Sequence, residues 1–474
     1  MALKEECGVV GVIGHPEAAN LIYLSLYALQ HRGQEGSGIV TIDSGGAFRS
    51  RKKFGLVRDA FNREDISQLE GVSGVGHNRY STSGGKLLQN LQPFTFRTSI
   101  GEIAIVQNGN LTNAEEIRKS LEEEGAIFQS TSDTEVFTHL IARAKSDSFL
   151  ERLAQSMRQV KGAYALVVLT KNRMFAIRDP YGFRPLIIGR KGEAVVAVSE
   201  TCALNLIGAE FEREVLPGEI IEVFPDGFIK SHSLLEQKKS GFCSFEPIYF
   251  ARPDSRVFGR QIYDLRKMMG TVLAEESGVD ADVVIAVPDS GVPMACGYAE
   301  AAGIPFELGL VRNHYIGRTF IEPSQSIRDF GVKLKLNPVE SVIAGRRVIV
   351  VDDSLVRGTT SVKILRMIRD AGAKEVHFRL GSPPITHSCY FGVDTPTRDK
   401  LLAAQRNVDE IREFIGADSL AFLSESGLQR VLGAEKDSYC YGCFSGNYPE
   451  EIGVELSQEP TDGTGGPGYV SFRA

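Results

Sequence analysis

The stretch Val348-Ile-Val-Val-Asp-Asp-Ser-Leu-Val-Arg-Gly-Thr-Thr360 carries the strongest fold signal in the chain. Its first four residues are β-branched and apolar, which predicts a buried strand of a parallel sheet. Two carboxylates follow where that strand should end, and a polar loop then leads into a segment with helical spacing from Ser361 to Gly372. Strand, loop and helix N-terminus together predict a phosphate-binding turn in an α/β domain, where Gly358 lets the backbone approach the anion.

The carboxylates Asp352 and Asp353 indicate that the ligand of this site is more than a phosphate group. Carboxylate oxygens accept hydrogen bonds from sugar hydroxyls and are ligands that Mg²⁺ prefers, so a phosphorylated sugar matches both halves of the stretch. A second loop, Pro288-Asp-Ser-Gly-Val-Pro293, follows another predicted strand at Val283 to Val287. In a doubly wound sheet both loops lie at the carboxyl ends of parallel strands, where ligands bind. Taken alone, each loop is also compatible with an ordinary turn.

Length and composition exclude several classes of protein for this chain. A chain of 474 residues is long enough for two or more domains. The net charge of −7 argues against a nucleic-acid partner. No uncharged apolar run approaches the ~18 residues of a membrane helix, and the N-terminus lacks the apolar core of a secretory signal. We therefore expect a cytoplasmic protein without disulfides and without a membrane partner.

Hydrophobic periodicity changes near residue 235. Before it, short strands follow one another with tight turns and helices interrupt them, which predicts antiparallel sheets flanked by helix pairs. After it, strands at Phe306 to Val311, Val348 to Val351 and Val376 to Leu380 alternate with helices, which predicts a mostly parallel, doubly wound sheet. We expect a leader at 1–6, one domain at 7–235, a second at 236–455 and a loose tail at 456–474.

Cys7 opens the first predicted strand after a six-residue charged leader. If Met1 to Glu6 are removed, Cys7 gains a free α-amino group with a reference pKa near ~8, beside a thiol near ~8.5. The amino group is then a general base for the thiol of the same residue, so no separate histidine is needed. The alternative is a small cysteine buried in a strand.

Five motifs follow in a fixed order and together resemble the glutamine amidotransferase domain of the N-terminal-nucleophile class, which has an α+β fold, the αββα sandwich. They are Cys7-Gly-Val-Val-Gly11, His31-Arg-Gly-Gln-Glu-Gly36, Gly76-His-Asn-Arg-Tyr-Ser-Thr82, Gln107-Asn-Gly-Asn-Leu111 and Ser132-Asp-Thr-Glu135.

The resemblance implies a role for each candidate residue of this domain. Cys7 would be the nucleophile, and Arg79 and Asp133 would bind the α-carboxylate and α-amino group of glutamine. Asn108 and Gly109 would form the oxyanion hole. Other interpretations exist, since Asn-Gly is a common hairpin turn, Arg79 fits a surface ion pair and Asp133 fits a helix N-cap. His31 and His77 are expected to pack or orient loops.

The opening stretch resembles the phosphoribosyl pyrophosphate (PRPP) motif of type I phosphoribosyltransferases. The resemblance implies a Mg²⁺ ion near Ser290, Asp352 and Asp353. A long basic segment, Arg312 to Lys335, resembles the flexible loop that would close over the substrate. The residues implied in PRPP binding are Asp289, Ser290, Asp352, Asp353, Ser354, Arg357, Gly358, Thr359, Thr360, Lys333 and Lys335.

Both resemblances in one chain match the family of glutamine PRPP amidotransferases, and the cysteines resemble its iron–sulfur branch. The implied [4Fe–4S] ligands are Cys243, Cys389, Cys440 and Cys443. Four thiolates with one C-x-x-C suit either Zn²⁺ or an iron–sulfur cluster, and spacing does not choose between them. Cys202 and Cys296 match no ligand pattern and are expected to pack.

This family membership would imply the conversion of glutamine, PRPP and water into 5-phosphoribosylamine, glutamate and pyrophosphate, the first committed step of purine synthesis. It also implies ammonia transfer between the two sites, feedback inhibition by purine nucleotides and a homo-oligomer, either dimer or tetramer. Two rivals are a PRPP-sensing regulator, which would need a DNA-binding element, and a sugar-phosphate aminotransferase, which would need an isomerase domain in place of the Asp352-Asp353 loop.

Overall fold

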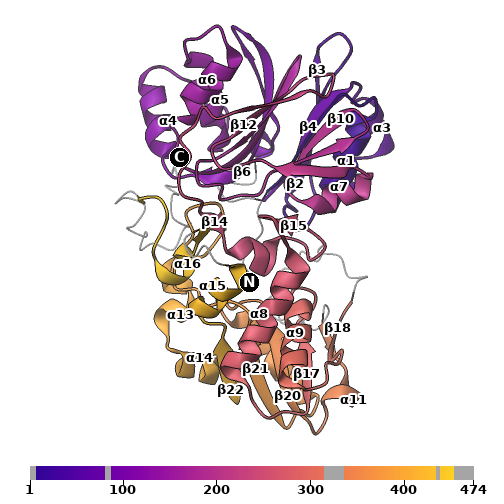
Figure 1. Ribbon diagram of the computed structural model, residues 1–474, viewed down its shortest axis with the longest axis vertical. Coiled ribbons are helices and arrows are strands. Elements are labelled where there is room, and N and C mark those ends of the chain that lie inside the picture. The colour runs from indigo at the N-terminus through magenta and orange to yellow at the C-terminus, as the bar shows by residue number, and fades with distance from the viewer. Residues whose placement is uncertain (1–6, 81–86, 314–335, 434–437, 453–474) are drawn as a thin grey trace.

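The computed structural model describes residues 7–80, 87–313, 336–433 and 438–452. The expected leader at 1–6, the tail at 456–474 and the candidate PRPP ligands Lys333 and Lys335 lie outside the described residues, as does most of the basic segment. The described chain forms an N-terminal and a C-terminal unit that are stacked along the long axis of the molecule (Figure 1).

The N-terminal unit contains two antiparallel sheets. Strands β1 (Gly8–Ile13), β2 (Gly36–Ile42), β3 (Phe48–Phe54), β4 (Ser73–Arg79), β9 (Ile187–Lys191), β10 (Ala194–Val198) and β11 (Glu210–Glu214) form the first sheet, in the order β11-β9-β10-β1-β4-β2-β3. Strands β5 (Phe94–Thr98), β6 (Gly101–Leu111), β7 (Gly162–Thr170), β8 (Arg173–Arg178), β12 (Ile220–Val223) and β13 (Ile229–His232) form the second, in the order β13-β12-β8-β7-β6-β5.

These sheets pack face to face, and helices cover their outer faces (Figure 1). Side chains alternate along each strand, so Val9 of β1 joins the apolar layer between the sheets whereas Val10 faces the helices. The first sheet is covered by α1 (Ala18–Ala28), α2 (Val57–Ala60), α3 (Arg63–Ser67) and α7 (Thr201–Ile207). The second is covered by α4 (Ala114–Glu123), α5 (Thr134–Arg143) and α6 (Phe149–Met157). The predicted αββα sandwich is confirmed.

The C-terminal unit is built on a parallel sheet of four strands in the order β17-β20-β21-β22, namely β17 (Val283–Ala286), β20 (Arg347–Asp352), β21 (Glu375–Leu380) and β22 (Ser419–Phe422). Ile349 and Val351 pack with α8 (Ile262–Ser277), α9 (Val292–Ala302) and α15 (Glu425–Leu432) on one face. Val348 and Val350 pack with α11 (Glu340–Ile343), α12 (Thr359–Asp370) and α14 (Val408–Ile415) on the other. Helices on both faces bury the strand completely, as its four apolar residues predict.

The prediction of a sheet strand at Phe306 to Val311 is wrong. In the described chain Phe306 makes a single parallel bridge to Val284, and β18 (Leu310–Arg312) instead pairs with β19 (Leu336–Pro338) in a separate antiparallel ribbon. Pro305 has no N–H to extend the ladder on one side of this bridge. On the other side, the Gly309 N–H donates to the Glu307 carbonyl at 2.9 Å and not to β17, so the pairing ends after one bridge. Strand β22, which the sequence pattern does not predict, completes the sheet beside β21.

Shorter elements join the two units and close the C-terminal one. They are η1 (Leu88–Asn90), β14 (Phe242–Cys243), the π-helical turn η2 (Glu246–Phe250), β15 (Arg256–Val257), β16 (Arg260–Gln261), η3 (Arg398–Lys400), α13 (Leu402–Gln405), β23 (Tyr439–Cys440) and α16 (Gly442–Ser445). None of the helices in the described part of the chain has both the length and the apolar character of a membrane span.

Candidate functional site

Cys7 lies immediately before β1, at an edge where β4 runs antiparallel to it. Its thiol donates to the carbonyl oxygen of Tyr80, with the sulfur 3.6 Å from that oxygen. Burial raises the pKa of the Cys7 thiol to about 11. The thiol therefore keeps its proton at neutral pH, and a nucleophile at this position needs a base to remove it.

Two charged side chains of the candidate glutamine site lie close enough to act on this thiol. The positive charge of Arg79 lowers the pKa of Cys7 and the negative charge of Asp133 raises it. Arg79 Nη1 donates to Glu35 Oε1 at 2.5 Å, and both side chains are less than one-tenth exposed. Arg79 is thus in a buried ion pair with the His31–Gly36 motif, so the surface ion pair suggested as its alternative role is wrong.

Asp133 precedes α5, but its side chain makes no capping hydrogen bond. Its Oδ2 instead accepts from the backbone N–H of Leu111 at 3.0 Å and from Gln107 Nε2 at 3.2 Å, which fixes the carboxylate against β6. Burial raises its pKa. The alternative of a capping aspartate is therefore wrong, and the carboxylate is fixed where a ligand cation would reduce the cost of its burial.

The candidate oxyanion residues Asn108 and Gly109 lie within β6 and pair with Ala165 and Tyr164 of β7. They do not form a hairpin turn, so that alternative is wrong. Asn108 is 1 % exposed, and among the described residues its Nδ2 has no hydrogen-bond partner. Gly109 has φ +146°, and a Cβ there would lie 2.1 Å from the oxygen of Ala163. The strand thus presents a buried amide donor beside a position that accepts only glycine.

His77 orients the same strand and does not carry charge. It is fully buried, and its Nε2 donates to the carbonyl oxygen of Gln107 at 3.0 Å. Burial lowers the pKa of His77 to about 3, so the ring is neutral at physiological pH. The hydrogen bond joins β4 to β6 across the sandwich, next to the candidate oxyanion residues, which agrees with the expected orienting role.

In the C-terminal unit, the two loops expected to share one site do meet at the end of β20. Ser290 Oγ donates to Asp353 Oδ2 at 2.5 Å, and Ser354 Oγ donates to Asp353 Oδ1 at 2.5 Å. Burial and the adjacent negative charge of Asp353 raise the pKa of Asp352 well above its usual range. Two crowded carboxylates beside two hydroxyls suit a hard cation or a polyol, because either would offset the buried negative charge.

The loop after the acid pair ends at the first turn of α12, as its sequence predicts. Gly358 has φ +71° and is the residue before the helix, where a Cβ would lie 2.7 Å from Leu402. Thr359 and Thr360 are the first two helical residues and are exposed, as is Arg357. The start of α12 therefore lies at the sheet edge, and a helix N-terminus is a place where an anion can bind. Asp289 is the exception, because its exposed carboxylate pairs with Arg312 instead of joining the acid pair.

The four candidate ligand cysteines converge. The side chains of Cys243, Cys389, Cys440 and Cys443 line one small cavity that is walled mostly by apolar side chains. Strand β14 pairs in parallel with β23, which aligns Cys243 with Cys440. Burial raises the pKa of the Cys243 thiol to about 11 and that of Cys443 well above its usual value. Four thiols on one cavity are donors that either Zn²⁺ or an iron–sulfur cluster takes as thiolates. As the side chains stand, no group of three or more ligand residues in the described parts of the chain is arranged to hold a metal ion.

The remaining two cysteines lie elsewhere. Cys202 is buried in α7, with its sulfur 3.8 Å from Glu200 Oε2. Cys296 is in α9 and does not line the cavity. Neither Cys202 nor Cys296 therefore lines the cavity that the four candidate ligand cysteines share.

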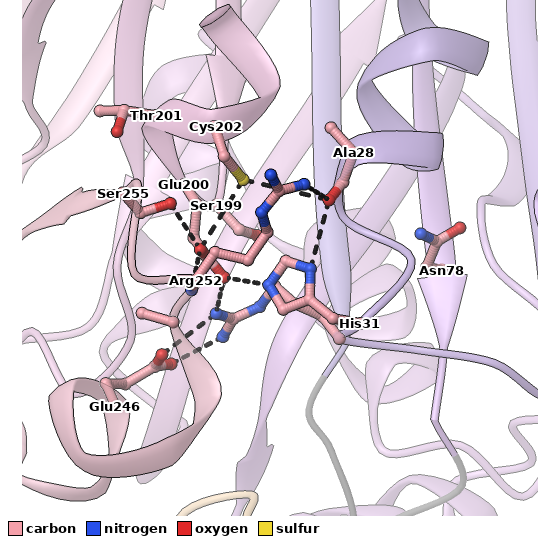
Figure 2. A network of polar contacts seen from close by, with 12 residues as sticks. Ala28, His31, Asn78, Ser199, Glu200, Thr201, Cys202, Glu246, Arg252 and Ser255 are labelled. Atoms are coloured by element: carbon pink, nitrogen blue, oxygen red, sulfur yellow. Dashed lines mark hydrogen bonds and ion pairs between the residues drawn. The ribbon is translucent and has the colours of Figure 1, made fainter. Parts of the chain in front are cut away.

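A buried network of charges was missed by the sequence analysis (Figure 2). Arg32 Nη1 donates to Glu200 Oε1 at 2.6 Å, and Arg32 Nη2 donates to Glu246 Oε1 at 2.6 Å. All three side chains are fully buried. Arg32 belongs to a motif that the sequence analysis used, but nothing in the sequence distinguishes Glu200 or Glu246 from the many surface carboxylates.

These two units define a class of enzyme in which a glutamine-splitting domain precedes a phosphoribosyl-transferring one. Residues 77–205 match the family model of a glutamine amidotransferase domain, and residues 261–380 match that of a phosphoribosyl transferase domain. The match at 77–205 does not include Cys7, so the case for the nucleophile depends on the geometry above.

The chain is similar to known proteins and to a solved structure over nearly its whole length. It is 55% identical to amidophosphoribosyltransferase 1, chloroplastic, of Arabidopsis thaliana, over 94% of this chain and 79% of that protein. It is 48% identical to the amidophosphoribosyltransferase of Bacillus subtilis, over 95% of both chains. A solved structure of the B. subtilis glutamine PRPP amidotransferase, complexed with ADP and GMP, superposes with TM-score 0.90 at 46% identity and covers 95% of this chain and 98% of that one.

The chain belongs to the amidophosphoribosyltransferase family, the enzymes that combine glutamine with PRPP in purine biosynthesis.

Proposed function

We propose that Cys7, as the first residue of the processed chain, releases ammonia from glutamine, and that this ammonia reaches PRPP bound at Asp352 and Asp353. The observation that carries the proposal is the buried, protonated Cys7 thiol, on which the charges of Arg79 and Asp133 act. The same unit holds the buried amide of Asn108, whose Nδ2 has no hydrogen-bond partner among the described residues. Such a thiol is inert until a base is supplied, and removal of residues 1–6 supplies one on Cys7 itself.

The glutaminase half follows from these positions. The α-amino group of Cys7 takes the thiol proton, and the thiolate attacks the side-chain amide carbon of glutamine. Asn108 Nδ2 and the Gly109 N–H donate to the oxygen that becomes negative. The amino group returns the proton to the leaving nitrogen, so ammonia departs and a thioester remains. Water then hydrolyses the thioester, giving glutamate and free Cys7. Arg79 and Asp133 orient the substrate through its α-carboxylate and α-amino group.

In the transferase half, the ribose hydroxyls donate to Asp352 and Asp353, and the 5′-phosphate binds the N–H groups of the loop from Ser354 to Thr360. Asp289, Ser290, Lys333 and Lys335 would contact the pyrophosphate. Mg²⁺ held near Ser290, Asp352 and Asp353 would supply positive charge against the departing pyrophosphate. Ammonia attacks C1 of the ribose, the bond from C1 to the pyrophosphate oxygen breaks, and the product is 5-phosphoribosylamine.

For the cysteine cavity we propose a [4Fe–4S] cluster held by Cys243, Cys389, Cys440 and Cys443. The resemblance to the iron–sulfur branch supports a cluster over a single Zn²⁺ ion, because four thiolates with one C-x-x-C suit either group. Such a group would tie the junction between the units to the C-terminal segment and would not take part in the chemistry. Iron and acid-labile sulfide of about four each per chain would support it, and one zinc per chain would refute it.

Regulation, assembly and location are further parts of the proposal. Purine nucleotides are proposed as feedback inhibitors, supported by the relative that was solved with ADP and GMP. A homo-oligomer, dimer or tetramer, and a cytoplasmic location are proposed from the sequence resemblance and composition. Several plant relatives are named chloroplastic, so the compartment differs among members of the family.

The two-site scheme is tested with Cys7→Ser, assayed with glutamine and, separately, with ammonium salt at alkaline pH. We expect glutamine-dependent formation of phosphoribosylamine to fall by about 1000-fold or more, because the hydroxyl is a far weaker nucleophile. Ammonia-dependent formation should stay within about twofold, because the PRPP site is untouched. Loss of both activities together would refute separate sites, and retained glutamine activity would refute Cys7 as the nucleophile.

A further inference from the structure

One buried guanidinium connects the candidate nucleophile to the other unit of the molecule. Arg32 Nε donates to the backbone carbonyl of Cys7 at 3.2 Å, while its Nη2 donates to Glu246 Oε1 at 2.6 Å. Arg32 and Cys7 belong to the N-terminal unit, whereas Glu246 begins η2, whose Ile248 and Phe250 pack in the core of the C-terminal unit. Figure 2 shows Glu246 approaching the network from below, opposite Glu200.

Cys7 depends on this contact for its position. The ladders of β1 begin at Gly8, which pairs with Asn78, so the backbone of Cys7 lies just outside the paired strand. Its carbonyl is held instead by Arg32, and that carbonyl orientation fixes the direction of the thiol and the α-amino group on the neighbouring Cα. A shift of Arg32 would therefore move both reacting groups.

The Arg32 side chain is in turn held by carboxylates from both units. Its Nη1 donates to Glu200 at 2.6 Å and to Glu246 Oε2 at 3.0 Å, so the planar fork spans two carboxylates from different units. Arg184 Nη1 lies 3.6 Å from Glu246 Oε1 and balances the second negative charge. Buried charges of this kind tolerate little displacement, because each is costly without its partner.

The segment that carries Glu246 is also hydrogen-bonded to α8 of the C-terminal unit. Arg266 of α8 is fully buried and donates to the carbonyl oxygens of Pro247 at 2.9 Å and Ala251 at 2.8 Å. Its positive charge also acts on Asp353 of the acid pair. A short series of buried hydrogen bonds therefore extends from Arg266 through η2 to the backbone of Cys7, and Arg266 acts on the acid pair through its charge.

We propose that Arg32 is a positioning residue, and that its ion pair with Glu246 makes glutamine cleavage depend on the seating of the C-terminal unit against the N-terminal one. This inference rests on the proposed role of Cys7 as the nucleophile. It assigns no proton transfer to Arg32, which acts only by holding the Cys7 carbonyl.

The test uses Glu246→Gln, which keeps the shape of the side chain and removes its charge, and Arg32→Lys, which keeps the charge and removes the fork. We expect glutamine-dependent kcat to fall about 100-fold in each variant, since a displacement near 1 Å costs roughly that much. The KM for glutamine should change little, because Arg79 and Asp133 are intact. Ammonia-dependent activity should stay within about twofold, which also shows that the C-terminal unit is folded.

Ser255→Ala is the matched control. Ser255 is fully buried, comes from the same unit as Glu246 and donates to Glu200 Oε2 at 2.7 Å, but it does not contact Arg32 in the described structure. This variant removes a hydrogen bond between the units and leaves the Arg32 fork in place, so its glutamine-dependent kcat should stay within about twofold. The double variant Arg32→Lys/Glu246→Gln should be no slower than the slower single one, because the pair acts as one element.

Three results would overturn the inference. These are an unchanged kcat in Glu246→Gln, an equal loss of glutamine- and ammonia-dependent activity, or an equal loss in Ser255→Ala. If Arg32→Lys does not fold, Glu246→Gln and its control still decide the question. Cys7→Ser, assayed in parallel, separates the two proposals: if it keeps glutamine activity the proposed nucleophile fails, and if it loses that activity while Glu246→Gln keeps it, only the positioning role fails.

Discussion

The two candidate sites differ in how much of each is already formed without substrate. In the N-terminal unit, Gly109 packs against Ala163, His77 fixes the Gln107 carbonyl and Asp133 is held by the Leu111 N–H. In the C-terminal unit, the acid pair Asp352-Asp353 is crowded, and the positive charge of Arg266 offsets its negative charge only in part. The first site is preorganised by backbone packing, whereas the second gains its charge balance from what it binds.

The largest effect is expected from a substitution in the candidate PRPP site, and it tests whether the two sites act separately. Asp353→Asn should lower both glutamine-dependent and ammonia-dependent synthesis by about 1000-fold, because it removes the charge that the cation and ribose require at the shared step. Hydrolysis of glutamine measured alone, as glutamate release, is the readout that separates the two halves. If the ammonia-dependent reaction persisted in this variant, the acid pair would not be the transferase site.

A smaller loss is expected when the preorganised site is broken. Asn108→Ala should lower glutamine-dependent kcat by about 100- to 1000-fold, the usual effect of losing one oxyanion donor, and leave ammonia-dependent activity unchanged. Gln159→Ala is the control, because it also removes an amide side chain, here an exposed one in the turn that follows α6. A rise in the KM for glutamine with unchanged kcat would instead show that Asn108 binds the ground state.

The smallest effect is expected on the free energy of unfolding, and it is a gain, whereas the substitutions above cause losses of activity. The folded-state pKa of Asp352 lies above its unfolded value near ~3.9, so ionisation of this group costs stability as the pH rises through the folded pKa. Asp352→Asn should therefore stabilise the ligand-free protein by about 1 kcal/mol at neutral pH, and the gain should vanish below about pH 4. Denaturant unfolding at both pH values measures it. Destabilisation at neutral pH would show that the charge is already offset.

Much of this picture follows from local sequence patterns. The four residues Val348 to Val351 predict the central parallel strand, and the acid pair and Gly358 predict the binding loop, because strand, turn and helix start are determined over a few residues. The expected convergence of four cysteines from three distant segments is confirmed by their shared cavity. That expectation came from a resemblance, since spacing alone does not show which cysteines meet.

The parts that were missed depend on long-range partners. Glu200 and Glu246 have no sequence mark, and only the fold brings both onto Arg32. The short Ser419–Phe422 strand carries too few residues to show a period. It pairs with β21 at one edge of the sheet, whereas Phe306 makes its single bridge to β17 at the opposite edge. Buried polar pairs and edge strands are set by tertiary packing, which local propensity does not report.

The central claim is that Cys7 becomes reactive when it becomes the first residue. The direct test is the intact mass of the purified active enzyme, together with the rate of Cys7 alkylation against pH in the processed chain and in a variant that retains residues 1–6. The account predicts a mass without those six residues, rapid alkylation near neutral pH in the processed chain, and an apparent pKa near 11 for the unprocessed thiol. An enzyme that keeps the six residues and splits glutamine at full rate would contradict it.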